Sequence, residues 1–234
     1  MKHMIAALLS VQALASTAQA IEITGGTADL SWSAFTQDTG ISRTTLRGSL
    51  EAGFNPSLGT QLDLSLYDFN ARNLSAYNAT LHGLYHATST TTLGAFLGNE
   101  ELENSTLDFY GLEVRHGFSS LTAEAYAAYG EEDGESASLF GLALHKDAGS
   151  NVRFGAEADF LDVDSAQVAR LALNIGYKLN ERASFYGEAG LLDYEAGPLS
   201  DSRAFVGAGL KVGFRPRGGT TFGWRGLLAK VPGL

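Results

Sequence analysis

Apolar and polar residues alternate along most of the chain, and the clearest case is the segment 151–178. Every second residue is apolar from Val152 to Phe160, and the same alternation resumes from Ala169 to Tyr177. A strict period of two predicts β-strands with one apolar and one polar face. Each segment has about 11–13 residues, whereas soluble strands usually have ~5–6 and a bilayer requires ~9–11. We therefore predict a hairpin long enough to cross a membrane.

The charged residues of this hairpin suggest its register. A turn centred just after Val163 would place Glu157 opposite Arg170, and Arg153 opposite Asn174. The same register would pair apolar residues with apolar residues on the other face, as strand pairing requires. We predict this register, with Glu157 and Arg170 as a cross-strand pair.

The same alternation recurs along the chain as far as Phe214, with a spacing of roughly 16–18 residues per strand. It predicts about 12 strands, and an even number suits a closed barrel of antiparallel strands. We expect short turns after the even-numbered strands and longer, acidic external loops, such as 99–105 and 130–136, after most odd-numbered ones. The predicted fold class is all-β, an antiparallel transmembrane β-barrel over residues 21–214.

The first 20 residues have the layout of a secretory signal peptide. A short polar start and the apolar run Met4–Ala15 precede a small-x-small cleavage site that ends at Ala20. The apolar run is too short to span a membrane comfortably as a helix. We predict that residues 1–20 are removed on export and that the mature chain begins at Ile21.

Composition narrows the function classes. The formal net charge is -10, and an acidic balance argues against nucleic-acid binding. The chain has no cysteine, which excludes a disulfide-built fold and a lipid-modified cysteine after the signal peptide. Mean hydropathy is near zero, which suits a membrane barrel because only alternate residues meet lipid.

Aromatic residues on the apolar face gather near the predicted strand ends. Membrane barrels carry aromatic girdles at both interfaces, where an amphipathic ring sits at the depth of the headgroups. The predicted interface aromatics are Trp32, Phe54, Tyr77, Tyr85, Tyr129, Phe160, Tyr177, Phe185 and Phe214.

The polar face collects the side chains that we predict to line a pore: Arg47, Glu51, Asp63, Glu113, Arg115, Glu124, Arg153, Glu157, Arg170, Asn174, Glu188, Arg203 and Lys211. Such residues either line an aqueous pore that filters ions or fill a narrow lumen with salt bridges. A barrel of about 12 strands lies between the filled barrels of 8 strands and the open barrels of 16, so size leaves both alternatives open. The signs nearly balance, and no ion selectivity follows from them.

These features together resemble the porins of Gram-negative outer membranes. The likeness rests on the signal peptide, the repeated amphipathic strands and a last strand that ends in an aromatic residue, Phe214. The chain departs from that group in its strand number and in residues 215–234, which follow Phe214. The resemblance implies location in the outer membrane, contact with lipid and with the barrel-assembly machinery, and passive passage of small hydrophilic solutes or ions. It implies no enzyme activity and no cofactor, and it leaves oligomerisation open.

Two other functions stay open, a non-conducting structural or adhesive barrel and an outer-membrane enzyme that acts on lipid. His82 and His86 share a face but lie about 13 Å apart along a strand, too far for one metal ion. The sequence contains no Gly-x-Ser-x-Gly motif of a serine hydrolase. The acidic residues near 100–103 and 131–135 are expected at the external rim, as solvated loops or as a cation-enriching patch.

The C-terminal tail, residues 215–234, carries a short apolar and basic run from Trp224 to Lys230. It could plug the lumen, lie at the periplasmic interface or stay mobile, and we favour an ordered periplasmic or intraluminal segment. A plug would lower the conductance of a channel.

Overall fold

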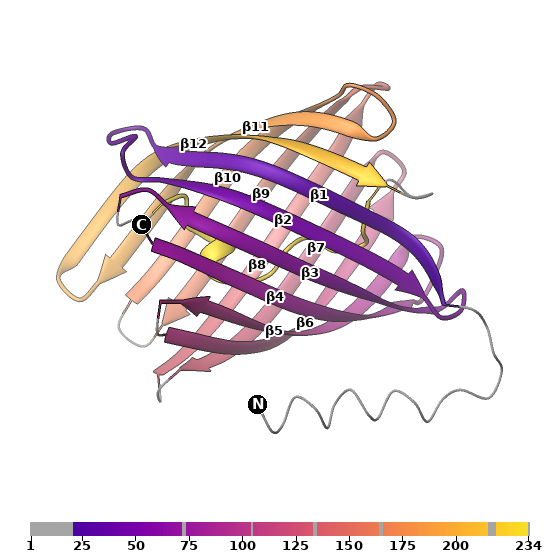
Figure 1. The fold of residues 1–234 in the computed structure, drawn as a ribbon, viewed down its shortest axis with the longest axis horizontal. Coiled ribbons are helices and arrows are strands. Elements are labelled where there is room, and N and C mark those ends of the chain that lie inside the picture. Colours follow the sequence, from indigo (N-terminus) through magenta and orange to yellow (C-terminus); the bar gives the residue numbers. More distant parts are fainter. Residues whose placement is uncertain are drawn as a thin grey trace.

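The computed structural model describes residues 21–71, 74–103, 105–132, 135–163, 166–214 and 219–233. The predicted signal peptide lies outside these ranges. Within them the chain forms a closed barrel of antiparallel strands, in which each strand pairs with its neighbours in sequence and β1 pairs with β12 (Figure 1). The strands are β1 (Glu22–Phe35), β2 (Ser42–Gly53), β3 (Leu58–Phe69), β4 (Leu74–His86), β5 (Thr91–Leu102), β6 (Ser105–Phe118), β7 (Leu121–Glu132), β8 (Glu135–Ala148), β9 (Val152–Val163), β10 (Ala166–Lys178), β11 (Ala183–Ala196) and β12 (Leu199–Phe214). The predicted barrel of about 12 strands is confirmed.

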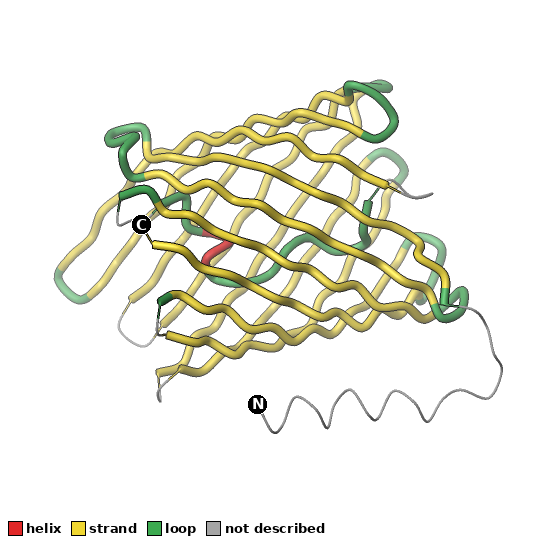
Figure 2. The backbone as a smooth tube through the Cα atoms, in the orientation of Figure 1, coloured by secondary structure: helices red, strands yellow, loops and turns green. Residues whose placement is uncertain are grey.

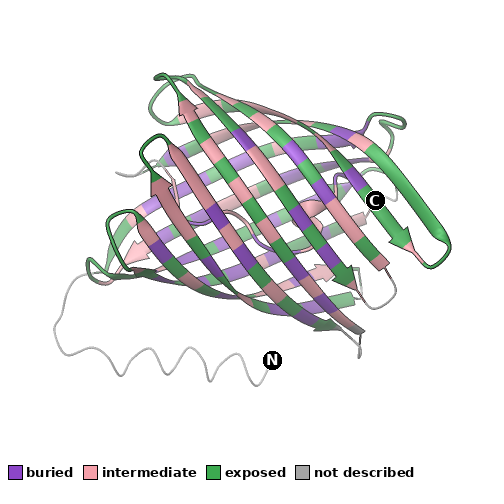
Figure 3. Ribbon diagram, turned by 180° about the vertical axis from the view of Figure 1, so that it is seen from behind, coloured by how far each residue is buried: buried purple, intermediate pink, exposed green. Residues whose placement is uncertain are grey.

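Side chains alternate between the two faces of the wall, so bands of buried and exposed residues cross each strand (Figure 3). In β3, Gln61 and Asp63 are fully buried in the interior, whereas Leu62 and Leu64 are 43% and 52% exposed on the outside. Apolar side chains outside and polar side chains inside reverse the arrangement of a soluble protein, and this reversal suits a barrel surrounded by hydrocarbon. No helix in the described ranges is long and apolar enough to cross a membrane.

The predicted interface aromatics lie on the outer surface, with one exception. Phe54 is half-buried in the turn that follows β2. The exposed ones are Trp32, Tyr77, Tyr85, Tyr129, Phe160, Tyr177, Phe185 and Phe214. Their role at a membrane interface stays a prediction.

The predicted register of the β9–β10 hairpin is wrong by two residues. Arg170 lies opposite Asp159, and Asn174 lies opposite Gly155. The strands continue to Val163 and from Ala166, so the turn is centred one residue later than predicted. A shift of two residues keeps every side chain on its predicted face.

The predicted long, acidic loops are also wrong. Strands occupy most of 99–105 and 130–136, because β5 continues to Leu102 and β7 to Glu132. Polar residues continue the period of two there, and the ladder hydrogen bonds continue with it. The connection Thr36–Ile41 is the longest among those that follow odd-numbered strands in the described residues (Figure 2). We call this end of the barrel the loop end and the end where β1 begins the turn end.

Candidate functional site: the lumen and the tail inside it

The tail described by residues 219–233 runs through the barrel interior, from the turn end to the loop end (Figures 1 and 2). At the turn end it passes so close to β1 that a Cβ added to Gly25 would lie 1.9 Å from the carbonyl oxygen of Gly219. At the loop end Gly233 packs against the main chain of Ile41 and Ser42. The sequence left three positions open for the tail: in the lumen, at the periplasmic interface, or mobile. The structure shows the first of these, with the tail inside the lumen.

In the turn half of the barrel, the wall binds the main chain of the tail. The side-chain amide of Gln61 accepts a hydrogen bond from the Phe222 amide at 3.0 Å and donates one to its carbonyl at 2.9 Å. Glu51 accepts from the amide of Thr221 at 2.6 Å. Glu124 accepts from the amide of Gly223 at 3.0 Å. Arg115 of β6 also donates to the carbonyl of Thr221. The residues that bind the tail in this half therefore come from four strands, β2, β3, β6 and β7.

In the loop half, the same kind of contact recurs. Glu100 accepts hydrogen bonds from the amides of Leu227 and Leu228, at 2.6 and 3.2 Å. Arg43 donates to the carbonyl of Leu228, and Ser33 donates to that of Pro232 at 2.8 Å. Glu100 is buried in the lumen, so the prediction that it lies at the external rim is wrong. Glu100 belongs to strand β5 and points inward from it.

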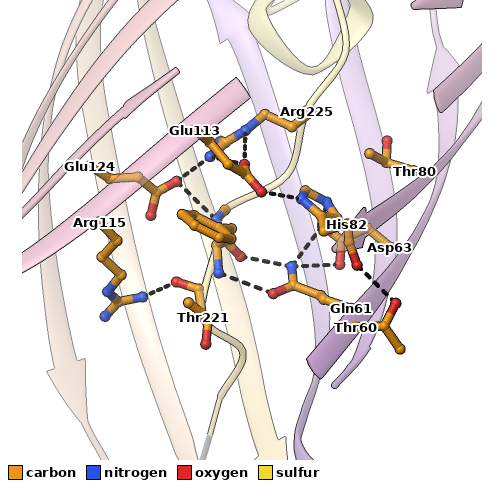
Figure 4. Close-up of polar contacts among 12 residues, drawn as sticks. Thr60, Gln61, Asp63, Thr80, His82, Glu113, Arg115, Glu124, Thr221 and Arg225 are labelled. Carbon is orange, nitrogen blue, oxygen red and sulfur yellow. Dashed lines mark hydrogen bonds and ion pairs between the residues drawn. The ribbon is translucent and has the colours of Figure 1, made fainter. Parts of the chain in front are cut away.

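The side chain of Arg225 contacts two carboxylates of the wall, those of Glu113 and Glu124 (Figure 4). Its Nε donates to Glu113 at 2.9 Å, and its terminal nitrogen donates to Glu124 at 2.5 Å. The guanidinium carbon lies 4.1 Å from the ring centroid of Tyr126. Two carboxylates and an aromatic face form a complete site for a planar cation.

A histidine supports this site from behind. His82 lies between Glu113, whose oxygen is 2.7 Å from Nδ1, and Asp63, whose oxygen is 3.3 Å from Nε2 (Figure 4). Its ring stacks on Phe222 with a centroid separation of 6.2 Å. His82 therefore connects wall carboxylates to the tail. No cluster of three His, Cys, Asp or Glu that could hold a metal ion occurs in the described residues.

The two halves of the lumen differ in polarity. Toward the loop end, inward residues form apolar clusters, among them Phe96, Phe109, Tyr126 and Leu139 in one, and Phe35 and Phe205 in another. Leu227 of the tail packs against the first of these clusters. A cavity of about 1710 Å³ lies beside the tail. It opens at the turn end, where its lining includes the turn residues Pro56, Ser119 and Asn151, and it reaches Arg43 in the loop half.

Charged side chains line this cavity, and cations outnumber carboxylates among them. The cations are Arg43, Arg47, Arg115, Arg153, Arg170, Lys178, Arg182, Lys211, Arg225 and Lys230, and the carboxylates are Asp29, Glu124, Glu157, Asp159, Glu181 and Glu188. Several cations are neutralised by ion pairs, as where Arg170 contacts Glu157, Asp159 and Glu188 at 3.2, 3.0 and 2.5 Å. The predicted pair of Glu157 and Arg170 therefore forms, but diagonally across the strands.

Four of the cations of the wall lie against the tail instead. Arg47 and Lys211 lie on the ring of Trp224, each 4.9 Å from the ring centroid, and Arg43 and Arg115 contact tail carbonyls. Among the residues that the structure describes, none of these four makes an ion pair with a carboxylate within 4.0 Å.

The predicted pore residues fall into three groups. Those that line the cavity are Arg47, Arg115, Glu124, Arg153, Glu157, Arg170, Asn174, Glu188 and Lys211. Glu51, Asp63 and Glu113 are buried in the wall, where Glu51 and Glu113 bind the tail directly. Arg203 lies apart, over the ring of Phe35 and half-exposed.

Sequence reasoning missed five wall residues that form hydrogen bonds or ion pairs with the tail: Ser33, Arg43, Gln61, Glu100 and Asp159. The period of two extends to all five positions and indicates that they face inward. Phe35, Phe109 and Phe205 on the nominally polar face were a further signal, because large apolar residues there indicate a packed lumen rather than a water-filled one.

No protein-family model matches the chain, and no curated protein matches it. Solved structures do match. They include the KdgM porin (10% identity, covering 81% of this chain and 99% of that one, TM-score 0.60) and the NanC porin (10% identity, 79% and 98%, TM-score 0.64). A third is the COG4313 outer membrane channel from Pseudomonas putida F1 (9% identity, 86% and 98%, TM-score 0.61).

The chain has the fold of an outer-membrane porin. The resemblance stated from the sequence is thus confirmed for the fold. Identities of 9–10% carry no further conclusion about activity.

Proposed function

We propose that this chain is an outer-membrane channel for passive diffusion of small hydrophilic solutes or ions. The observation that carries this proposal is the charged cavity of about 1710 Å³, which lies within a wall whose outer face is apolar. An apolar exterior lets the barrel span hydrocarbon, and a polar cavity replaces part of the hydration shell of a solute. The likeness to the KdgM and NanC porins supports this assignment.

The charges favour anions as the transported solutes. More cations than carboxylates line the cavity, and Arg43, Arg47, Arg115 and Lys211 contact the tail without an ion pair to a carboxylate within 4.0 Å. Asp29 lies opposite Arg47 and Lys211 in the neighbouring strands, and Glu124 lies opposite Arg115, so these charges are partly compensated. The excess of cations over the whole lining attracts anions and repels cations. One of the similar structures is the KdgM porin in complex with disordered oligogalacturonate, an acidic saccharide, and it agrees with this preference.

Export, assembly and membrane contacts belong to the same proposal. Residues 1–20 direct export, and Phe214 at the end of β12 marks the last strand for the barrel-assembly machinery. The outward leucines and aromatic residues contact lipid. The proposed passive diffusion requires no cofactor and no catalytic residue.

A non-conducting barrel is the second candidate, and the packed loop half favours it. Measurement in planar bilayers separates the two. We expect the purified mature chain to carry a small current, held low by the tail, with a reversal potential under a salt gradient that shows anion preference. Absence of any current over the usable voltage range would leave the non-conducting barrel as the assignment.

A further inference from the structure

The wall binds the tail mainly through groups that every peptide has. Gln61, Glu100 and Arg43 contact amides and carbonyls of the tail, not its side chains. The Gln61 amide pairs with both main-chain groups of Phe222, as a neighbouring strand would. Contacts of this type recognise a peptide main chain without reading its side chains. Gly226 is an exception, because its φ of +116° and the nearby Glu100 carboxylate leave no room for a side chain there.

Other wall sites contact side chains of the tail, such as the Trp224 ring and the Lys230 ammonium, and the most complete of them holds Arg225. The guanidinium of Arg225 is 2% exposed and lies between Glu113 and Glu124 over the ring of Tyr126. Without a cation there, two carboxylates would face each other in a buried place, which is costly. A lysine would fit less well, because the planar fork contacts both carboxylates while it lies on the ring.

Main-chain contacts on both sides of the Arg225 pocket define a receptor for a peptide. We propose that the lumen wall is a binding site for an arginine-bearing peptide, and that the chain's own tail is its intramolecular occupant. The cavity beside the tail reaches the turn end, so a peptide from that side has a route to the site. The proposal does not require the barrel to carry current.

The test uses the whole chain, folded with its tail in place. A protease recognition sequence is inserted between Phe214 and Gly219 and is cleaved after folding, so that the tail is no longer covalently attached. In the chain with Arg225, we expect the cleaved fragment to copurify with the barrel in detergent. In the Arg225→Ala chain, we expect the fragment to be lost on dilution, which leaves an empty, folded wall.

The emptied barrel then receives a fluorescein-labelled synthetic peptide of residues 219–233, and its anisotropy reports binding. We expect saturable binding, and at least about a hundredfold weaker binding for the same peptide carrying Arg225→Ala, because that change leaves two buried carboxylates unpaired. A peptide with Thr220→Ala, a residue for which no hydrogen bond is recorded in the described structure, serves as the matched control and should bind like the parent. Should the Arg225→Ala chain fail to fold, exchange of excess labelled peptide into the cleaved parent chain makes the same comparison.

Two results overturn the proposal. One is loss of the cleaved fragment from the parent chain together with no binding of the labelled peptide. The other is equal binding of the parent and Arg225→Ala peptides. Neither depends on conductance, so a failure of the channel assignment would be seen separately.

Discussion

The turn half and the loop half of this lumen have the same wall and the same tail, yet the cavity opens in the turn half and apolar side chains cluster in the loop half. In the turn half, charged residues such as Arg115 and Lys211 keep space open around the tail. In the loop half, Phe109 and Phe205 belong to two apolar clusters in the interior, and Leu227 packs against the cluster of Phe109. The comparison shows that the size of the inward side chains, and not strand number alone, decides whether a barrel of this width is open.

The largest effect is expected where the tail passes from one half to the other. Replacing Arg225 with Ala should lower the free energy of unfolding by about 3–5 kcal/mol, because it leaves Glu113 and Glu124 buried without a cation. Thermal or denaturant unfolding in detergent measures the change. Arg225→Lys is the control and should recover part of the loss. A loss below about 1 kcal/mol for Arg225→Ala would mean that the tail is not held in this site.

The next effect tests the packed half. Phe205 is 1% exposed and lies under the guanidinium of Arg170. Its replacement by Ala should lower the free energy of unfolding by about 3 kcal/mol, because the loop half cannot collapse around the void. Thr122→Ala at the cavity of the turn half is the comparison and should change stability by less than about 0.5 kcal/mol. Equal effects of the two changes, seen by unfolding, would remove the distinction between the halves.

A smaller effect separates two adjacent residues. Glu100 faces the lumen and binds two tail amides, whereas Glu101 faces outward and accepts a hydrogen bond from Tyr77. Glu100→Gln should cost about 1–2 kcal/mol through the loss of charge-assisted hydrogen bonds. Glu101→Gln should stay within about 0.5 kcal/mol of the parent. If Glu101 proved the more sensitive of the two in unfolding experiments, the assigned faces of β5 would be wrong.

The smallest effect concerns charge in the turn half. Lys211→Gln should reduce the anion preference of the current without changing stability strongly, because its ammonium lines the cavity and rests on Trp224. Reversal potentials under a salt gradient give the preference. Lys146 lies on the outward side of β8, so Lys146→Gln should leave the anion preference unchanged. An unchanged reversal potential for Lys211→Gln would show that this cation does not face the permeation path.

Much of this wall could be predicted from the sequence, because the period of two assigns each residue to a face. Arg115 and Lys211 were placed inside on that ground. The register of β9 and β10 was missed because a shift of two residues leaves the pattern of faces unchanged, so only the turn decides it.

The position of the tail could not be predicted from the alternation of apolar and polar residues. Residues 219–233 have no period of two and form only a short 3₁₀-helix, Leu228–Lys230. Their position depends on contacts with residues distant in sequence, such as Gln61 and Ser33. The sequence does carry a signal for the apolar loop half, because Phe35 and Phe205 fall on the nominally polar face, but the pattern alone does not show which residues they pack against.

The most direct test of the central claim, that the tail limits passage through the lumen, is the single-channel conductance of the parent chain and of Arg225→Ala in the same planar bilayer. The account predicts a small current for the parent and a several-fold larger current, still preferring anions, for the variant. Equal conductance in the two chains, with both folded, would contradict it.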